Sequence, residues 1–263
     1  MTGAAVDVFD GAMQGLEAGF KVLHITTFDL GTCTVSDDAE RILKDPTLLA
    51  FDYIPVREGS RIVGVLDRQA KPARGAAGGH MRQIDPACLV SAETPLRMFI
   101  PLIGRSPYWL VVRAAGIKGI VTRSDLLKLP MRLHAFTIVT HLETLMADVI
   151  RAYRDSDDWL ALLSDGRQER ILKKQQKLQK KKLDPPVVEL TDFCDKRVVV
   201  AKLLGLHKEF TAPLEEIEEL RNSVAHSGTY LNDDGDVQMF VERMSAAEAW
   251  IERLREFVAR ARR

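Results

Sequence analysis

Apolar and polar positions follow two different rhythms along the chain, and the change comes near residue 130. Before that point, short runs rich in β-branched and aromatic residues alternate with turn signals, as in β-hairpins. Two hairpins of the same design are expected, one from residues 51–56 and 61–66, the other from residues 109–113 and 117–122. Because the design returns after about sixty residues, the pattern predicts an internal repeat, with residues 74–79 as a flexible loop between the copies.

Beyond residue 130 the strand signals almost vanish, and apolar residues recur every three or four positions, as in amphipathic helices. Five helices are expected: residues 134–153, 159–182, 190–206, 211–226 and 246–262. Thr211 and Ser245 are the expected N-terminal caps of the last two helices. The predicted fold class is therefore α+β, with an N-terminal α/β domain over residues 20–130 and a C-terminal all-α helical bundle over residues 131–263.

Composition limits the class of protein without naming a partner. The 46% hydrophobic and 28% charged residues are typical of a globular protein, and the net charge is zero, so affinity for nucleic acid would need a local patch. The three cysteines are far apart and form no CxxC pair, which argues against a disulfide framework or a zinc site. No uncharged stretch approaches the roughly 18 residues of a membrane span. We expect a soluble, cytoplasmic protein without a membrane partner.

The stretch Gly119-Ile-Val-Thr-Arg-Ser-Asp125 joins the end of a predicted strand to the start of a helix near Ser124. A hydroxyl at Thr122 and a carboxylate at Asp125, beside a helix N-terminus, suit a phosphate and a ribose diol. The other interpretation of the same residues is that Ser124 or Asp125 simply caps the helix.

Together with Tyr53-Ile-Pro-Val56, this stretch resembles a tandem pair of CBS domains, a Bateman module, over roughly residues 20–130. The resemblance implies a regulatory module that binds an adenine nucleotide or a related ligand between its two repeats, at positions matched by Thr122 and Asp125. The first repeat has Asp67 and Ala70 at the corresponding places, and a carboxylate at Asp67 would repel a phosphate. One competent site is therefore expected, in the second repeat. The alternative is that the module serves only as a dimerisation scaffold.

A second candidate site lies on the predicted fourth helix. Its apolar stripe consists of Leu214, Ile217, Leu220 and Val224. Arg221 borders the stripe, while Asn222 and His226, four residues apart, share a more exposed face. Imidazole transfers protons near neutral pH, and a guanidinium group can bind a phosphate that gains charge in the transition state. The alternative is an ordinary solvated helix face.

The segment Arg221-Asn-Ser-Val-Ala-His226-Ser-Gly resembles the Arg-x4-6-His motif of HEPN domains. The resemblance implies a metal-independent endoribonuclease that works as a homodimer, with both copies facing one composite cleft and the ribose 2′-OH attacking the phosphate. His226 would then be the acid and base, Arg221 would stabilise the phosphate, and Asn222 would orient the pair. Such an enzyme needs no cofactor beyond a regulatory nucleotide.

These features predict a nucleotide-regulated ribonuclease that acts on RNA, as a stress or anti-phage effector or as a toxin with an antitoxin partner. The alternative is a non-catalytic regulator whose motif is vestigial. A third possibility is nucleotide transfer, with Tyr230 as the acceptor to test.

Two further features carry less weight. Residues 166–182 contain eight basic residues and one acidic residue, Glu169, and would either hold RNA phosphates or form a solvated helix face. His134, His141 and His207 have no carboxylates at ligand spacing, so we expect each of them to be packed in the core or exposed.

Overall fold

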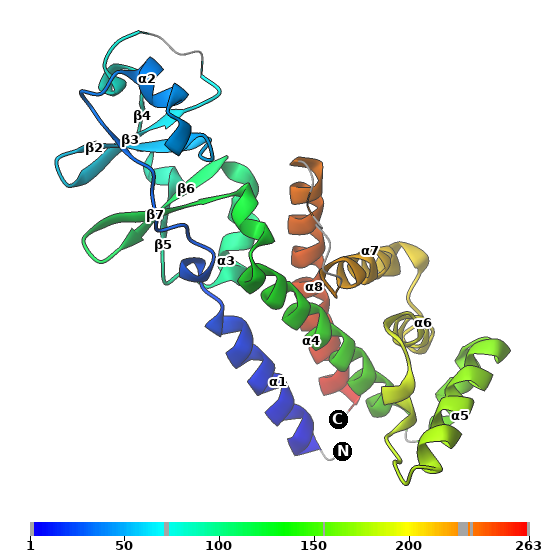
Figure 1. Ribbon diagram of the computed structural model, residues 1–263. Helices are drawn as coiled ribbons and strands as arrows, with labels where there is room; N and C mark the ends of the chain where they lie inside the picture. The colour runs from blue at the N-terminus through cyan, green and yellow to red at the C-terminus, as the bar shows by residue number, and fades with distance from the viewer. Residues whose placement is uncertain (1–2, 71–73, 155, 226–230, 232–233, 262–263) are drawn as a thin grey trace. The chain divides into compact units, whose positions relative to one another are not determined.

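The computed structural model describes residues 3–70, 74–154, 156–225, 231 and 234–261. The chain divides into two compact units (Figure 1). The strand unit is Ala18–Met131, and the helical unit combines Met1–Glu17 with Arg132–Arg263. The chain therefore passes between the units twice.

The strand unit contains two small sheets. The first has the order β1 (Cys33–Thr34), β2 (Tyr53–Glu58), β3 (Arg61–Asp67) and β4 (Arg82–Gln83); the second has the order β5 (Leu89–Ser91), β6 (Tyr108–Arg113) and β7 (Gly116–Thr122). In each sheet the first two strands are parallel and the hairpin that follows is antiparallel. Short helices α2 (Ala39–Lys44) and α3 (Leu96–Phe99) complete the unit. Both predicted hairpins are confirmed.

The two sheets are copies of one design. Tyr53 pairs with Asp67 in the first hairpin, and Tyr108 pairs with Thr122 in the second, so each position recurs 55 residues later. Even the irregularity in the register recurs, between Val56 and Arg57 and between Val111 and Val112. The internal repeat predicted from the apolar pattern is confirmed at the level of single residues.

The segment that precedes each repeat in the chain, its leading segment, pairs with the sheet of the other repeat. The backbone of Thr27, which precedes the first repeat, exchanges two hydrogen bonds of 2.9 and 3.0 Å with Ile120 on β7. Strand β4, which precedes the second repeat, pairs with Gly64 and Val65 on β3. The two halves are therefore interlocked, and neither sheet is complete without residues from the other half of the unit.

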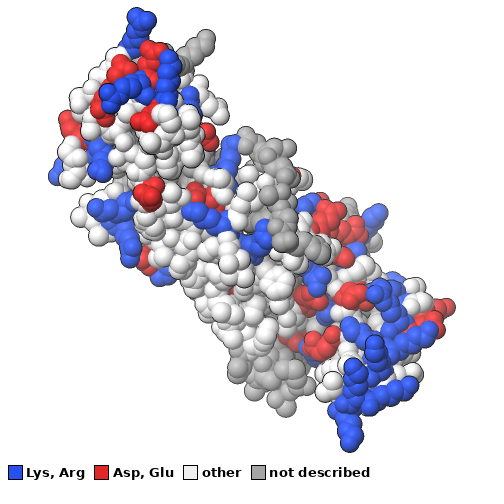
Figure 2. Space-filling view, viewed as in Figure 1, with Lys and Arg blue, Asp and Glu red and all other residues white. Residues whose placement is uncertain are grey.

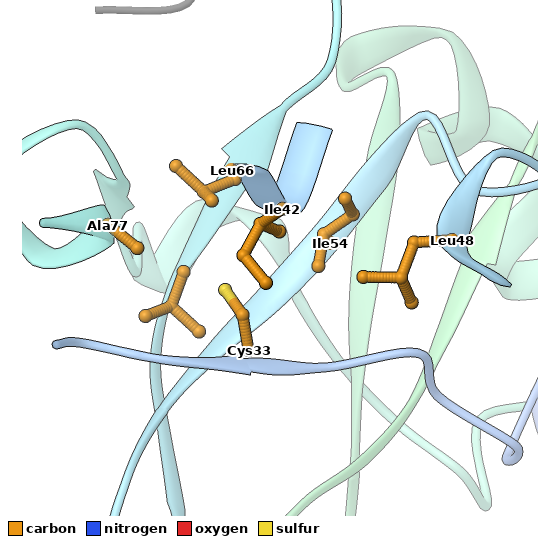
Figure 3. Packing of buried hydrophobic residues seen from close by; sticks show 7 residues of the cluster. Cys33, Ile42, Leu48, Ile54, Leu66 and Ala77 are labelled. Atoms are coloured by element: carbon orange, nitrogen blue, oxygen red, sulfur yellow. The ribbon is translucent and has the colours of Figure 1, made fainter. Parts of the chain in front are cut away.

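Two apolar clusters hold the strand unit together. Figure 3 shows the first, which gathers Cys33, Ile42, Leu48, Ile54, Leu66 and Ala77 under the first sheet. Burial raises the pKa of the Cys33 thiol to about 11, so this cysteine is a packing residue rather than a reactive one. The second cluster joins the two sheets through Val65, Tyr108, Leu110 and Ile120.

The helical unit consists of α1 (Gly3–Gly19), α4 (Leu129–Tyr153), α5 (Asp165–Gln179), α6 (Phe193–Leu203), α7 (Lys208–Ala225) and α8 (Asp234–Ala261). Among the described residues, α4 is the one helix long and apolar enough to cross a membrane by length and composition, and 67% of its apolar window is buried. Ile138, Leu142 and Met146 are fully inaccessible. Packing inside the unit accounts for the apolar composition of α4.

Two helices, α5 and α6, begin later in the chain than the sequence predicted. The stretch from Trp159 is a 3-10 helix, Asp157–Leu162, and Leu163 is extended, so that α5 begins only at Asp165. The helix predicted from Leu190 begins at Phe193, because Asp192 and Asp195 form a reciprocal capping box.

The N-terminal caps predicted for the last two helices are wrong. Helix α7 begins at Lys208, and the buried Thr211 hydroxyl donates to the Lys208 carbonyl inside the first turn. Helix α8 begins at Asp234, eleven residues before Ser245. Buried Val237, Phe240 and Met244 extend its apolar stripe towards the N-terminus, so burial outweighs the capping signal of a serine.

Helix α1, which the apolar pattern did not predict, is held by a buried ionic cluster. His141 on α4 is fully buried, and its two ring nitrogens lie 2.5 Å from a Glu17 oxygen and 2.7 Å from an Asp10 oxygen. Arg255 on α8 donates to the same Asp10 oxygen at 2.9 and 3.0 Å. The expectation that His141 is packed in the core or exposed is confirmed by its burial, while its two carboxylate partners, 124 and 131 residues away along the chain, were not predicted.

The cluster predicts how stability depends on pH. Burial raises the pKa of Asp10, but hydrogen bonds from Arg255 and His141 outweigh this effect and hold the pKa below its usual value of 3.8. The ionised form therefore stabilises the fold above the unfolded-state pKa of about 3.9, and this contribution is lost as the pH falls through the lower folded-state pKa.

We expect Asp10→Asn to lower the free energy of unfolding by about 1–3 kcal/mol at neutral pH, since it leaves buried partners without their counter-charge. Urea unfolding between neutral and strongly acidic pH should give a flatter stability curve for this variant than for the wild type. Glu252, which pairs with Arg255 from the solvent side, provides the control Glu252→Gln. Equal losses for both variants would contradict the assignment.

Candidate functional site

A cleft of about 140 Å³ opens in the strand unit at the predicted second-repeat site. Its lining consists of Thr27, Ala50, Phe51, Asp52, Tyr53, Ile120, Thr122, Ser124 and Asp125. Thr122 and Asp125, singled out from the sequence, thus lie in one cleft. The first repeat contributes residues 50–53 to the opposite wall, and the exchanged leading segment contributes Thr27.

The carboxylate of Asp125 organises one end of this cleft. It is 4% exposed and accepts from the Thr122 amide at 2.6 Å and from the Thr27 hydroxyl at 2.9 Å. Asp125 also forms a capping box with Thr122 at the start of the 3-10 helix Arg123–Leu127. Asp125 therefore caps the helical turn, as the alternative interpretation predicted, and it also lines the cleft.

Lys128 is a site residue that the sequence interpretation missed. Its ammonium lies 2.6 Å from Asp125 and donates to the Ile25 carbonyl at 2.8 Å and to the Thr27 hydroxyl at 2.9 Å. The lysine neutralises the buried carboxylate and fastens the leading segment to the capping turn. Its position three residues after Asp125 was the available signal, since residues at this spacing are neighbours in a helical turn.

Two hydroxyl groups line the cleft at the start of the turn. The Thr122 and Ser124 side-chain oxygens lie 2.9 Å apart, and the Thr122 hydroxyl donates to the Asp125 carboxylate at 3.2 Å. Burial raises the pKa of Tyr53, so this side chain remains a neutral phenol that forms part of the opposite wall. The site therefore offers hydroxyls and helix-terminal amides to an anion, and aromatic surface to a planar group.

The corresponding position in the first repeat carries an ion pair. Asp67 takes the place of Thr122, and Arg82, at the position of Thr27, lies 2.7 Å from its carboxylate. The Asp67 side chain is 10% exposed. Its charge is thus neutralised by the chain itself, which differs from the free repelling carboxylate expected from the sequence.

In the helical unit, Arg221 and Asn222 lie in the last turns of α7. Asn222 is exposed, and the Arg221 guanidinium, with its side chain 38% exposed, is 3.4 Å from Glu143 on α4. Glu143 is shared with Lys196 on α6, at 2.9 Å. His226 and Tyr230 lie outside the described residues, so the predicted Arg221–His226 pairing stays a prediction.

Within the described part of the chain, no group of three or more His, Cys, Asp or Glu side chains is arranged to hold a metal ion. His141 with its two carboxylates is enclosed in the helical core and is already bonded on both ring nitrogens.

Solved structures similar to this chain are CBS-domain proteins. A chain of CBSX2 in complex with AMP matches with 19% identity and a TM-score of 0.38, covering 44% of this chain and 98% of its own. The CBS domain of the bacterial CNNM/CorC family Mg²⁺ transporter in complex with ATP matches with 17% identity and a TM-score of 0.37, covering 46% and 92%. A CBS domain pair/ACT domain protein from Thermotoga maritima has 19% identity and a TM-score of 0.34, covering 41% and 93%. No family model and no curated protein sequence matches the chain.

The close approach of the leading segment to β7 is testable at Gly119. A Cβ atom there would lie 2.2 Å from the Thr26 side chain and 3.0 Å from the Thr27 carbonyl, so Gly119→Ala should displace the segment that carries Thr27. We expect a loss of about 1–3 kcal/mol in the free energy of unfolding. Gly116→Ala on the same strand meets no atom within 4 Å and is the control. Equal unfolding midpoints for the two variants would contradict the packing described.

Proposed function

We propose that the strand unit is a regulatory module that binds one adenine nucleotide in the cleft of the second repeat. The observation that carries this proposal is the convergence of Thr27, Thr122, Ser124 and Asp125 with residues 50–53 of the other repeat. Hydroxyls beside the start of a helical turn suit a phosphate, and the walls at Phe51, Tyr53 and Ile120 suit a base.

Binding would act through Asp125. A ribose hydroxyl that donates to this carboxylate competes with the Thr27 hydroxyl and the Lys128 ammonium, both of which are bonded to it. Lys128 immediately precedes α4, and the segment containing Thr27 follows α1. Since the chain passes between the two units at these two places, a change at Asp125 reaches both covalent connections to the helical unit. A ligand that favours one arrangement shifts the population towards it.

The second part of the proposal assigns the output to the helical unit, as a metal-independent ribonuclease with Arg221, Asn222 and His226 as its site. The favouring observation is that Arg221 remains partly exposed, with Glu143 approaching only its Nε atom at 3.4 Å. The outer edge of the guanidinium is then left for a phosphate. His226 would transfer the proton of the 2′-OH, and Asn222 would orient the pair.

In this proposal the active form is a homodimer acting on RNA in the cytoplasm, as a stress effector or as a toxin with an antitoxin partner. Three free cysteines suit a reducing compartment. The alternative is a nucleotide-sensing regulator whose helical unit only binds a partner and whose motif is vestigial. Nucleotide transfer to Tyr230 is the third possibility, and intact mass distinguishes it from the other two.

Isothermal titration with AMP, ADP and ATP tests the sensor, and the first and last of these are the ligands named for two similar proteins. We expect one nucleotide per chain. Thr122→Val keeps the shape and removes the hydroxyl, so affinity should fall about 10- to 100-fold, the range for a hydrogen bond to a charged group. Thr122→Ser should restore it, and Thr137→Val in α4 is the control. Binding to Thr122→Val as tight as to the wild type would refute the site.

Incubation of RNA with the full chain in the presence of a chelator tests the proposed output. Arg221→Ala and His226→Ala should each slow cleavage at least about 100-fold, as expected when one transition-state partner is removed. Products should carry 2′,3′-cyclic phosphate ends, and Arg253→Ala on α8 should cut like the wild type. If wild-type protein leaves RNA intact with and without each nucleotide, the ribonuclease proposal fails while the sensor proposal stands.

A further inference from the structure

The positive charge of the chain is concentrated on one helix that neither proposed site uses. In residues 166–182, which cover most of α5 and the three residues after it, eight basic side chains stand against one acidic side chain. The chain has 37 residues of each sign, so the remainder holds 29 basic and 36 acidic residues. Figure 2 shows the Lys and Arg side chains gathered over α5. A neutral protein thus carries a strongly positive local surface.

Only part of this charge is neutralised by the protein. Arg167 is bound by Asp192 at 2.8 Å and by Asp195 at 2.5 Å, and Lys173 pairs with Glu169 at 2.6 Å. Six exposed cations pair with no carboxylate in the described parts of the chain: Arg170, Lys174, Lys177, Lys180, Lys181 and Lys182. Lys174 donates to the Leu190 carbonyl at 3.0 Å and keeps its full charge. Six positive charges are therefore available to an external anion.

Helix stability does not explain this arrangement. Cations near a helix C-terminus are favoured by the helix dipole, but that effect fades within one turn and does not reach Arg170, Lys173 or Lys174. Pairs such as Arg170 with Lys174 and Lys173 with Lys177 place like charges four residues apart, which destabilises a helix. An anionic partner along the helix would remove this repulsion.

A cleft of about 500 Å³ reaches α5 at Gln175. Its lining from the neighbouring segments includes Arg154 and Ser156, and also the carboxylates of Asp157 and Asp184. Amide, hydroxyl and guanidinium groups can bind the polar edge of a base, and the volume is in the range of about 300–1,000 Å³ typical of small-ligand sites. Insertion of a helix into a lipid headgroup layer uses an apolar helix face, whereas Leu172 is the one strongly exposed large apolar side chain on α5.

We propose that α5 and this cleft form a binding surface for single-stranded RNA, with the phosphates along the basic side chains and an unstacked base in the cleft. The choice of RNA as the polyanion rests on the proposed ribonuclease function. The surface is also joined to the candidate site by ion pairs. Arg167 on α5 holds Asp195 on α6, and the next residue, Lys196, shares Glu143 with Arg221.

The test is fluorescence anisotropy of a labelled single-stranded RNA of about 20 nucleotides, longer than the sites of about 4–16 nucleotides that binding modules cover. The parent is the full chain with Arg221→Ala, in chelator, so that cleavage does not consume the probe. The test variant adds Lys177→Gln, Lys180→Gln, Lys181→Gln and Lys182→Gln. The control variant adds Arg61→Gln, Arg97→Gln, Arg113→Gln and Lys118→Gln, four exposed cations of the strand unit, and changes the net charge equally.

We expect the α5 variant to bind at least about tenfold more weakly at low salt and to lose about 3 units from the slope of log affinity against log salt, at about 0.7 per phosphate contact. The control variant should bind like its parent. Sedimentation of the same variants with anionic phosphatidylserine vesicles is the second measurement. Equal RNA binding by the α5 variant and its parent, an equal loss in both variants, or a loss of vesicle binding without a loss of RNA binding would overturn the proposal.

The same variants separate this inference from the proposed ribonuclease. If RNA binding depends on α5 but the wild-type protein cuts no RNA, the ribonuclease proposal is refuted and the binding-surface proposal stands. The converse result comes from a chain that keeps Arg221 and carries the four α5 substitutions. If this chain cleaves RNA at the wild-type rate and with the wild-type salt dependence, the binding-surface proposal is refuted and the ribonuclease proposal stands.

Discussion

The backbone pairing of Thr27 with Ile120 is the constraint on which the strand unit depends. It brings the leading segment of the first repeat onto the sheet of the second, and β4 makes the reciprocal crossing. The crossing demands glycine at Gly64 and Gly119, because a Cβ atom at either position would lie less than 3 Å from the crossing segment. The same crossing places the Thr27 hydroxyl against Asp125. The backbone pairing that packs the unit therefore also determines which residues line its cleft.

The sequence predicted the parts of this arrangement that local pattern encodes. Alternating apolar residues and turns predicted both hairpins and their repetition, and the spacing of Thr122 and Asp125 placed them correctly at the end of β7. Thr27 and the wall at residues 50–53 could not be predicted, since they reach the cleft by pairing between segments about 70 to 100 residues apart. The ion pair of Asp67 with Arg82 was missed for the same reason, because its two residues belong to different strands.

In the helical unit, the apolar stripes predicted the existence of the five helices α4 to α8 better than their ends. Burial decided where α8 begins, and a capping box decided where α6 begins. The His141 cluster shows the limit most clearly. His141 is bonded to two carboxylates that lie 124 and 131 residues away along the chain, and only tertiary packing brings them there. Charges thus differ in this unit: buried ones join helices, whereas most of those on α5 are exposed.

The cluster around Asp10 has a consequence for how the protein is made. Asp10 is bonded to Arg255, 245 residues further along the chain, so α1 is synthesised well before this partner. At about 5–20 residues per second, the wait is roughly 10 to 50 seconds. During that time Met13, which the finished fold buries, has no core to enter. The apolar side of α1 is therefore exposed on the nascent chain until α8 has been made.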